Sequence, residues 1–258
     1  MRGITISGAS RGLGAALAIG LAAPGVRLWL SARGATGLQA TAEACRARGA
    51  EVTICVADVR DAAALAVSLG AFAAAGPVHL AIANAGASAG TRPGGAPEDA
   101  ADARHMVEVN LIGAINLVGP LLPALLAARG QVAIIGSVAG WRGLPDMPAY
   151  CAAKAGLRAW AQGLRALHGP AGLTVTLVAP GFFDSAMGDR FRGPRPFLLS
   201  LDQAAARTLA AIAARRAEAM FPWPMALTMR ALALLPPRLG DAAARRLRFA
   251  IVPDGPSD

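Results

Sequence analysis

A phenol and an ammonium at helical spacing are the groups in this chain best suited to proton transfer. Tyr150 and Lys154 stand four residues apart, and they are the only tyrosine and the only lysine in 258 residues. On a helix this spacing places both side chains on one face. A phenol has an unperturbed pKa of about 10, and a neighbouring ammonium stabilises the phenolate and lowers that pKa. The pair is therefore typical of a general acid/base.

Ser137 favours this interpretation over the alternative, in which Tyr150 and Lys154 merely occupy an exposed helix face. It lies thirteen residues before Tyr150 and follows the apolar run 131–135, which predicts a buried strand. A hydroxyl at the carboxyl end of a strand and a phenol on the next helix can converge on one carbonyl oxygen. We therefore expect Ser137 and Tyr150 together to hold and protonate that oxygen.

A glycine-rich turn at residues 7–14 joins a first predicted strand, 4–6, to an apolar helix, 15–22. Glycines allow the backbone to turn tightly and to approach a pyrophosphate, which the free amides of the helix would bind. The spacing Gly-x-x-x-Gly-x-Gly differs from the commoner Gly-x-Gly-x-x-Gly, and a tight turn without a ligand is the alternative. The position directly after the first strand favours nucleotide binding.

The second predicted strand, residues 26–30, is followed by Arg33 rather than by an acid. No Asp or Glu occurs between Met1 and Gln39, whereas an NAD site usually carries an acid there to hold the ribose 2′-hydroxyl. Arg11 and Arg33 suit a 2′-phosphate instead. We expect NADP(H) to be preferred over NAD(H), with solvated surface arginines as the alternative.

Predicted strands and helices continue to alternate, which indicates an α/β fold with a doubly wound parallel sheet and helices on both faces. The next elements are helix 36–49, strand 51–57, helix 61–75 and strand 79–83. Asp58, at a strand end, would contact an adenine amino group or cap the helix that begins near Asp61. The sequence Asn84-Ala85-Gly86 would line the nucleotide site or form an ordinary turn.

Length and composition indicate one domain. A chain of 258 residues with 55% hydrophobic content can bury a sizeable core. The net charge is +9, but the arginines are scattered and aromatics make up only 5%, so we expect no nucleic-acid partner. Three cysteines without disulfide or metal-ligand spacing, and three histidines far apart, favour a reducing cytoplasmic location and no metal site.

Taken together, these motifs resemble the short-chain dehydrogenase/reductase family in its classical form. The resemblance covers roughly residues 1–190 and rests on the order and spacing of the glycine turn, Asp58-Val59, Asn84-Ala85-Gly86, Asn110, Ser137, Tyr150 to Lys154, and Pro180-Gly181. It implies a Rossmann-type sheet, a nicotinamide cofactor, a small carbonyl or alcohol substrate, and a homodimer or homotetramer. We assign residues 1–218 to this fold and 219–258 to a C-terminal helical extension of the same domain.

The resemblance also implies specific roles. Tyr150 would be the acid/base, Ser137 would polarise the substrate carbonyl, and Lys154 would lower the pKa of the tyrosine and hold the nicotinamide ribose. Asn110 would hold a water in a proton relay. Phe183 and Ser185 replace a smaller aliphatic residue and a threonine that are usual in the family. The implied cofactor contacts are Gly8, Ser10, Arg11, Gly12, Leu13, Gly14, Arg33, Asp58, Val59, Asn84, Ala85, Gly86, Tyr150, Lys154, Pro180, Gly181, Phe183 and Ser185.

Two apolar stretches raise the question of a membrane. The uncharged run 111–128 is long enough to span a bilayer, but it contains Asn116 and two prolines, and the resemblance implies a helix buried against the sheet and a neighbouring subunit. The second stretch is an apolar helix, 225–235, followed by an arginine-bearing helix, 239–251. A subunit contact, a substrate lid and a peripheral membrane contact through 221–251 all fit the second stretch.

The sequence therefore predicts an NADP(H)-dependent carbonyl reductase or alcohol dehydrogenase that acts on a bulky or apolar ketone or alcohol. Two alternatives use the same fold without catalysis. One is a dinucleotide sensor or regulatory scaffold, which the presence of both Tyr150 and Lys154 disfavours. The other is a membrane-surface adaptor that acts through the C-terminal stretch.

Overall fold

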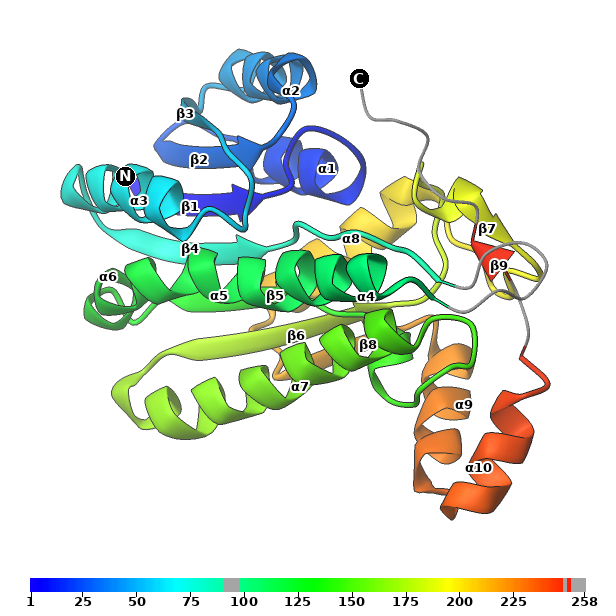
Figure 1. Cartoon of the computed structure of the whole chain (residues 1–258). Coiled ribbons are helices and arrows are strands. Elements are labelled where there is room, and N and C mark those ends of the chain that lie inside the picture. The colour runs from blue at the N-terminus through cyan, green and yellow to red at the C-terminus, as the bar shows by residue number, and fades with distance from the viewer. Residues whose placement is uncertain (91–97, 248–249, 252–258) are drawn as a thin grey trace.

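A computed structural model describes residues 1–90, 98–247 and 250–251 of the chain and shows a seven-stranded parallel sheet between layers of helices (Figure 1). The strand order is β3-β2-β1-β4-β5-β6-β8. The chain starts at β1 in the middle, winds outward to β3, and then crosses to β4 to wind in the other direction. In such sheets ligands bind at the carboxyl ends of the strands, where the order reverses. The predicted doubly wound fold is confirmed.

The strands are short and the helices longer. The strands are β1 (Arg2–Ser7), β2 (Val26–Ala32), β3 (Glu51–Val56), β4 (Val78–Ala83), β5 (Gln131–Ile135), β6 (Thr174–Pro180), β7 (Phe191–Arg192), β8 (Glu218–Phe221) and β9 (Ala250–Ile251). The α-helices are α1 (Gly12–Leu21), α2 (Ala35–Ala47), α3 (Ala62–Ala74), α4 (Ala100–Val107), α5 (Gly113–Val118), α6 (Leu122–Ala127), α7 (Pro148–His168), α8 (Leu201–Ala213), α9 (Trp223–Leu234) and α10 (Pro237–Ala244). The shorter helical turns are η1 (Glu108–Ile112), η2 (Gly119–Leu121), η3 (Val138–Gly140), η4 (Gly169–Ala171) and η5 (Gly188–Arg190).

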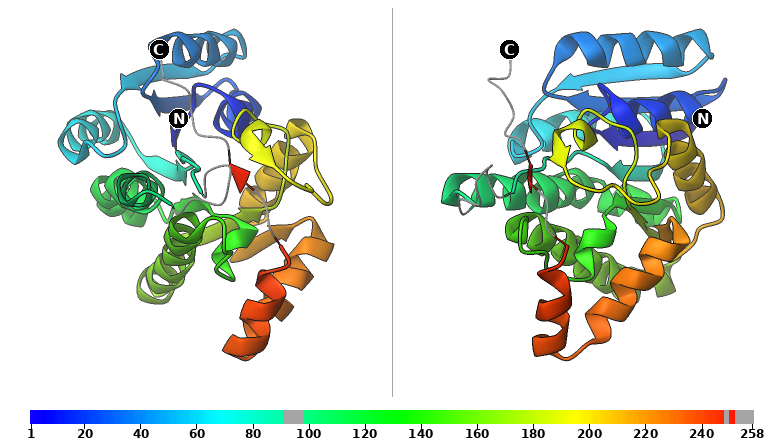
Figure 2. Two further views of the ribbon diagram at one scale, coloured as in Figure 1. Left: turned by 45° about the vertical axis from the view of Figure 1, so that its right-hand side comes forward. Right: turned by 90° about the vertical axis from the view of Figure 1, so that its right-hand side faces the viewer.

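Two hydrophobic cores lie on the two faces of the sheet, because successive side chains of a strand point to opposite faces. In β4, Leu80 and Ile82 belong to the first core, and Ala81 and Ala83 belong to the second. Helices α1, α2 and α8 cover the first core, and α3, α5, α6 and α7 cover the second (Figure 2). Each fully buried leucine stabilises the fold by about 1.5–3 kcal/mol. The central strands are buried on both faces, which explains their continuous apolar runs.

The helical run Ala100–Ala127 is long and apolar enough, by length and composition alone, to cross a membrane. In the structure Leu117, Leu121 and Leu125 of this run are fully buried in the second core. The amide of Asn116 donates to the carbonyl of Val59, at 2.9 Å. The run is therefore a core helix that packs against the sheet, as expected from its asparagine and prolines.

The C-terminal part of the chain differs from the sequence prediction in two ways. Strand β8, which was not predicted, pairs with β6 and completes the sheet, so the expected boundary at residue 219 falls inside a strand. The expected helix 239–251 is wrong, because α10 ends at Ala244 and residues 250–251 form β9, antiparallel to β7. Strands β8 and β9 each pair with a strand at least forty residues away in the sequence. Local propensity does not encode such long-range pairing. Arg248 lies outside the described residues.

Candidate active site

The glycine turn after β1 has a backbone conformation that residues with side chains could not adopt without strain or steric clash. Gly8 and Gly12 have φ of +67° and +56°, a left-handed conformation that favours glycine. A Cβ on Gly14 would lie 2.1 Å from the carbonyl oxygen of Gly8. The Asn84 amide, at the end of β4, donates to the carbonyls of Ser7 and Gly8 at 3.0 and 3.2 Å and fixes the turn. Asn84 therefore supports the glycine turn and does not belong to an ordinary turn of its own.

The amino end of α1 has the features of an anion site. Its first turn contains no acidic residue, and its N-cap residue, Arg11, makes no side-chain cap hydrogen bond. The first amides of a helix lack intrahelical acceptors and favour negative charge. The cradle formed by Gly8, Gly12 and Gly14 lies at this helix end, and it fits the pyrophosphate of a dinucleotide. The side chains of Leu13 and Val59 are buried in the two cores and are therefore not available to such a ligand.

Arg11 and Arg33 lie at the same edge of the sheet. The amide of Ala9 donates to the carbonyl of Ser31 at 3.0 Å, which ties the glycine turn to the end of β2. Each arginine follows one of these anchored residues by two positions, and both side chains are exposed. Within the described part of the chain, neither guanidinium forms a hydrogen bond or an ion pair. Both are therefore available to an anionic ligand.

Asp58, beyond the end of β3, is engaged by a neighbour. Its carboxylate forms an ion pair with Arg60 at 2.8 Å. This hydrogen-bonded partner lowers the pKa of Asp58, and the charge of Arg33 adds to the effect. The expected alternative role of Asp58 as the helix cap is wrong, because Asp61 accepts the hydrogen bond from the Ala64 amide at 2.9 Å and caps α3.

Ser137, Tyr150 and Lys154 come together beyond the carboxyl end of β5. Ser137 caps the short turn η3 and accepts a hydrogen bond from the Ala139 amide at 3.2 Å. Its side chain also lies close enough to Tyr150 to oppose the rise in the pKa of the phenol. The Lys154 ammonium donates to the carbonyl of Ile135 at 3.1 Å and lies 5.6 Å from the centroid of the Tyr150 ring. The predicted convergence of these side chains is present in the structure.

The pKa values at this site shift in directions that burial dictates. Desolvation raises the pKa of Tyr150 to about 12, and the side chain of Ser137 opposes the shift. Desolvation lowers the pKa of Lys154 to about 8. The expected net lowering of the tyrosine pKa is therefore wrong for the free protein, because burial penalises the phenolate more than its neighbours stabilise it. At neutral pH the phenol holds its proton, and the lysine can exchange one.

Asn110 lies within the π-helical turn η1, an irregularity often found at functional sites. The buried amide nitrogen of Asn110 donates to the carbonyls of Ala87 and Met106, at 3.0 and 2.9 Å. A Cβ on Gly86 would lie 2.9 Å from Asn110 Oδ1 and 3.8 Å from Lys154 Nζ. Asn110 therefore braces the loop after β4 next to Lys154. Its role in holding a water stays a prediction.

The segment from the end of β6, residues 180–185, was expected to contact the cofactor, but two of its side chains have partners within the protein. Gly181, which follows Pro180, donates its amide to the carbonyl of Phe221 at 2.7 Å. Phe183 packs against the first core, and the Ser185 hydroxyl accepts from the Gly188 amide at 3.0 Å. Because the Phe183 side chain packs in the core and the Ser185 hydroxyl caps a local turn, the structure does not bring them to Ser137, Tyr150 and Lys154.

An apolar wall that the sequence did not reveal lies beside Tyr150. Its ring packs in one cluster with Met147, Phe191 and Ile251. Phe182 stacks edge-on against Phe191, with ring centroids 4.8 Å apart. Pairing of β7 with β9 brings Phe191 and Ile251 together from positions sixty residues apart. No local pattern signals such a contact. The sequence also predicts a substrate rim at residues 88–103 and 184–200, of which positions 91–97 lie outside the described residues.

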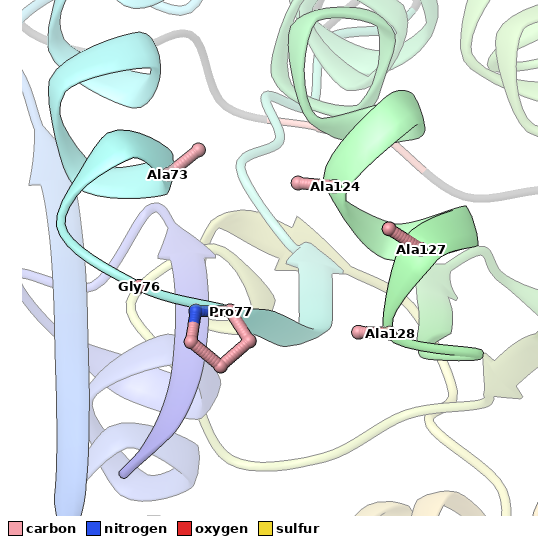
Figure 3. Close-up of a pocket in the computed structure, with 6 residues that line it drawn as sticks. All are labelled: Ala73, Gly76, Pro77, Ala124, Ala127 and Ala128. Atoms are coloured by element: carbon pink, nitrogen blue, oxygen red, sulfur yellow. The ribbon is translucent and has the colours of Figure 1, made fainter.

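Ser137, Tyr150 and Lys154 line neither of two cavities in the structure. One, of about 290 Å³, lies where β4 begins, at the opposite edge of the sheet, and its lining of alanines, Gly76 and Pro77 offers no side chain for chemistry (Figure 3). The other, of about 250 Å³, lies against α7 and is lined in part by Trp141, Arg142 and Cys151. Among residues 1–90, 98–247 and 250–251, no group of three His, Cys, Asp or Glu side chains could hold a metal ion.

The chain is similar to known proteins. The chain matches the family described as short chain dehydrogenase over residues 2–195. It is 36% identical to an uncharacterized oxidoreductase of Myxococcus xanthus over 245 residues, which cover 94% of this chain and 96% of that protein. It is 32% identical to a 3-dehydrosphinganine reductase of Arabidopsis thaliana, covering 78% and 60%. An alcohol dehydrogenase from the archaeon Thermococcus sibiricus, solved with 5-hydroxy-NADP, superposes with a TM-score of 0.74 at 26% identity, covering 86% and 96%.

Proposed function

Because the chain belongs to the short-chain dehydrogenase family, whose members are oxidoreductases that use a nicotinamide dinucleotide, we propose that it is an NADP(H)-dependent carbonyl reductase or alcohol dehydrogenase. Its substrate is a bulky or apolar ketone or alcohol. One observation carries the proposal: Ser137, Tyr150 and Lys154 form a contiguous group at the edge of the sheet where the glycine turn lies. A sensor without catalysis would need neither the phenol nor the buried lysine.

The residues divide the chemistry among them. The glycine turn and the first amides of α1 would hold the pyrophosphate of the cofactor, and the nicotinamide, when bound, supplies or accepts the hydride. Ser137 donates a hydrogen bond to the substrate oxygen, and Tyr150 gives that oxygen a proton when a ketone is reduced. Tyr150 is suited to this step because its pKa of about 12 keeps the phenol protonated.

Lys154 would then return a proton to Tyr150, and Asn110 would hold the loop beside the lysine in place. With a pKa of about 8, the ammonium of Lys154 can release a proton near neutral pH and recover it from water. The bonds from Asn110 to Ala87 keep the neighbouring loop in place beside the lysine. In the oxidation direction Tyr150 first passes its proton by way of Lys154 to water, and the resulting phenolate then accepts the proton of the alcohol.

The preference for NADP(H) follows from charge. Arg11, at the start of α1, and Arg33, just beyond the end of β2, are exposed, and no acid follows β2 in the sequence to accept a ribose hydroxyl. A 2′-phosphate would form charge-assisted hydrogen bonds with one or both guanidinium groups. The solved relative with 5-hydroxy-NADP has a cofactor of this class.

The apolar wall supports the choice of substrate. Phe191 and Ile251 pack in one cluster with Tyr150, Phe182 contacts Phe191, and none of the three offers a charge to a polar substrate. The plant relative acts on 3-dehydrosphinganine, as its name states. We also propose a cytoplasmic homodimer or homotetramer, in keeping with three cysteines that form no disulfide.

A screen of NADPH oxidation against sugar, steroid, acyl and aromatic ketones tests the proposal, with Tyr150→Phe as the blank. We expect turnover with apolar ketones by the natural chain and none above background by the variant. Equal rates for both proteins would overturn the catalytic assignment. Turnover restricted to sugars would overturn the assignment of substrate class.

A further inference from the structure

Exposed apolar side chains gather on the hairpin formed by α9 and α10, residues 223–247. Trp223 and Leu227 on α9 are 74% and 62% exposed, and Leu234 and Leu239 at the turn are 86% and 59% exposed. Leu235 and Leu247 are also exposed. Elsewhere in the described chain such residues occur singly, as Val67 and Leu167 do, or in small pairs such as Phe197 and Leu198. A concentrated apolar surface usually marks an interaction site, whereas single exposed residues need no explanation.

The opposite face of α9 already has its packing partners. Met225, Met229 and Leu232 are buried in a cluster with Val138. The exposed set therefore forms a second apolar face on the same helix. A helix that is apolar on both faces is typical of one covered on both sides. The hairpin projects from the body of the molecule with its turn pointing outward, so this second face is accessible (Figures 1 and 2).

Positive charge borders the apolar surface. The hairpin carries four arginines and one acidic residue, Asp241, which forms an ion pair with Arg142 of the body. Arg230 is paired with Glu218. The remaining arginines, Arg238, Arg245 and Arg246, are exposed and have no side-chain partner among the described residues. A second copy of the chain would bring these like charges together. An anionic lipid surface complements both the charge and the apolar side chains.

We propose that the α9–α10 hairpin docks the protein on the surface of an anionic phospholipid bilayer. Trp223 and the leucines at the turn enter the boundary between headgroups and acyl chains, and the three free arginines contact the phosphates. The hairpin lies next to the catalytic residues, because on the buried face of α9 Met225 packs near Gly181 and in one cluster with Val138, the residue after Ser137. If the proposed function holds, an apolar ketone dissolved in the bilayer reaches Tyr150 from this side.

The proposal is tested by co-sedimentation of the full chain with phosphatidylcholine vesicles. One set of vesicles contains about 30% phosphatidylglycerol, which gives a negative surface potential, and the other set contains none. We expect binding to the anionic vesicles and a blue shift of tryptophan fluorescence that Trp223→Phe removes. The double variant Leu234→Ser/Leu239→Ser should bind at least about tenfold more weakly. Its matched control, Val67→Ser/Leu167→Ser, should bind as the natural chain does.

A second pair of variants tests the charge. Arg238→Gln/Arg245→Gln/Arg246→Gln should weaken binding about a hundredfold, since each arginine near an anionic surface contributes about 1 kcal/mol. Arg2→Gln/Arg207→Gln/Arg216→Gln removes the same charge elsewhere and should have a much smaller effect. Equal losses in the two triple variants would overturn the proposal.

Two further outcomes would contradict a lipid surface. One is a failure of the natural chain to sediment with anionic vesicles. The other is a change of oligomeric state in the leucine double variant, seen by sedimentation velocity without vesicle binding, which would assign the face to a second copy. NADPH binding by all hairpin variants should stay unchanged, so a failure here is distinguishable from failure of the proposed enzymatic function.

Discussion

The ammonium nitrogen of Lys154 lies 5.6 Å from the centroid of the Tyr150 ring and donates one hydrogen bond to the carbonyl of Ile135. The lysine is 5% exposed, and no described carboxylate pairs with it. A buried ammonium without an acidic partner is costly, and it persists where function requires it. The relationship between these two residues therefore supports the proposed activity and carries a local cost in stability.

Replacing the phenol should separate binding from chemistry. Tyr150→Phe removes one oxygen atom and leaves the ring in its apolar cluster. We expect kcat to fall by at least about a hundredfold, because general acid catalysis typically contributes 10²–10⁴-fold. Fluorescence titration should give a Kd for NADPH close to that of the natural chain. Turnover near the natural rate would exclude Tyr150 as the acid.

Removing the buried charge should stabilise the protein while it abolishes activity. The pKa of Lys154 falls from 10.5 to about 8 on folding, which costs roughly 3 kcal/mol at neutral pH. Loss of the bond to Ile135 offsets part of the gain, so Lys154→Met should raise the free energy of unfolding by about 1–2 kcal/mol at pH 7. Denaturant unfolding measures this. A variant less stable than the natural chain would show that the ammonium is well accommodated.

The same variant predicts a pH dependence with a defined sign. Between pH 8 and 10.5 the unfolded lysine holds a proton that the folded lysine has lost, so the stability of the natural chain rises with pH across this window. Below pH 8 the full cost is present. The stability advantage of Lys154→Met should therefore shrink by about 1–2 kcal/mol between pH 7 and pH 9.5. An advantage that stays constant over that range would contradict the lowered pKa.

Arg33 should decide between the two cofactors. Arg33→Ala removes a charged donor that only the 2′-phosphate would use, so we expect NADPH to bind about 10- to 100-fold more weakly and NADH to be little affected. Isothermal titration with both cofactors measures the difference. Arg207→Ala, an exposed arginine on α8, is the matched control and should change neither affinity. Equal weakening of both cofactors by Arg33→Ala would remove the argument for NADP(H).

The glycine turn should tolerate no side chain. Gly14→Ala places a Cβ within 2.1 Å of the Gly8 carbonyl oxygen, so the turn must open. We expect loss of measurable dinucleotide binding and a lower melting temperature. Gly70→Ala, inside α3 with no atom within 4 Å of the new Cβ, is the control. It should keep binding and gain up to about 1 kcal/mol of stability, since alanine favours a helix more than glycine does.

The sequence by itself determined the alternation of strands and helices up to β5 and the candidate catalytic group, which is Ser137, Tyr150 and Lys154. Apolar runs of strand length alternate with helical patterns, and glycine, serine, tyrosine and lysine follow particular strands. Because the carboxyl ends of parallel strands meet at one edge, the positions of Ser137, Tyr150 and the glycine turn followed from local signals. Their spacing along the chain was enough to place them together.

Only the tertiary structure decided the environment of those residues. The high pKa of Tyr150 and the low pKa of Lys154 come from burial under segments remote in sequence, and burial is a property of the packed chain. The wall formed by Phe191 and Ile251 depends on the pairing of β7 with β9, and the last sheet strand depends on β6. Strands as short as β7, β8 and β9 show little hydrophobic periodicity in the sequence, and their partners are remote. Their pairing therefore became visible only in the folded chain.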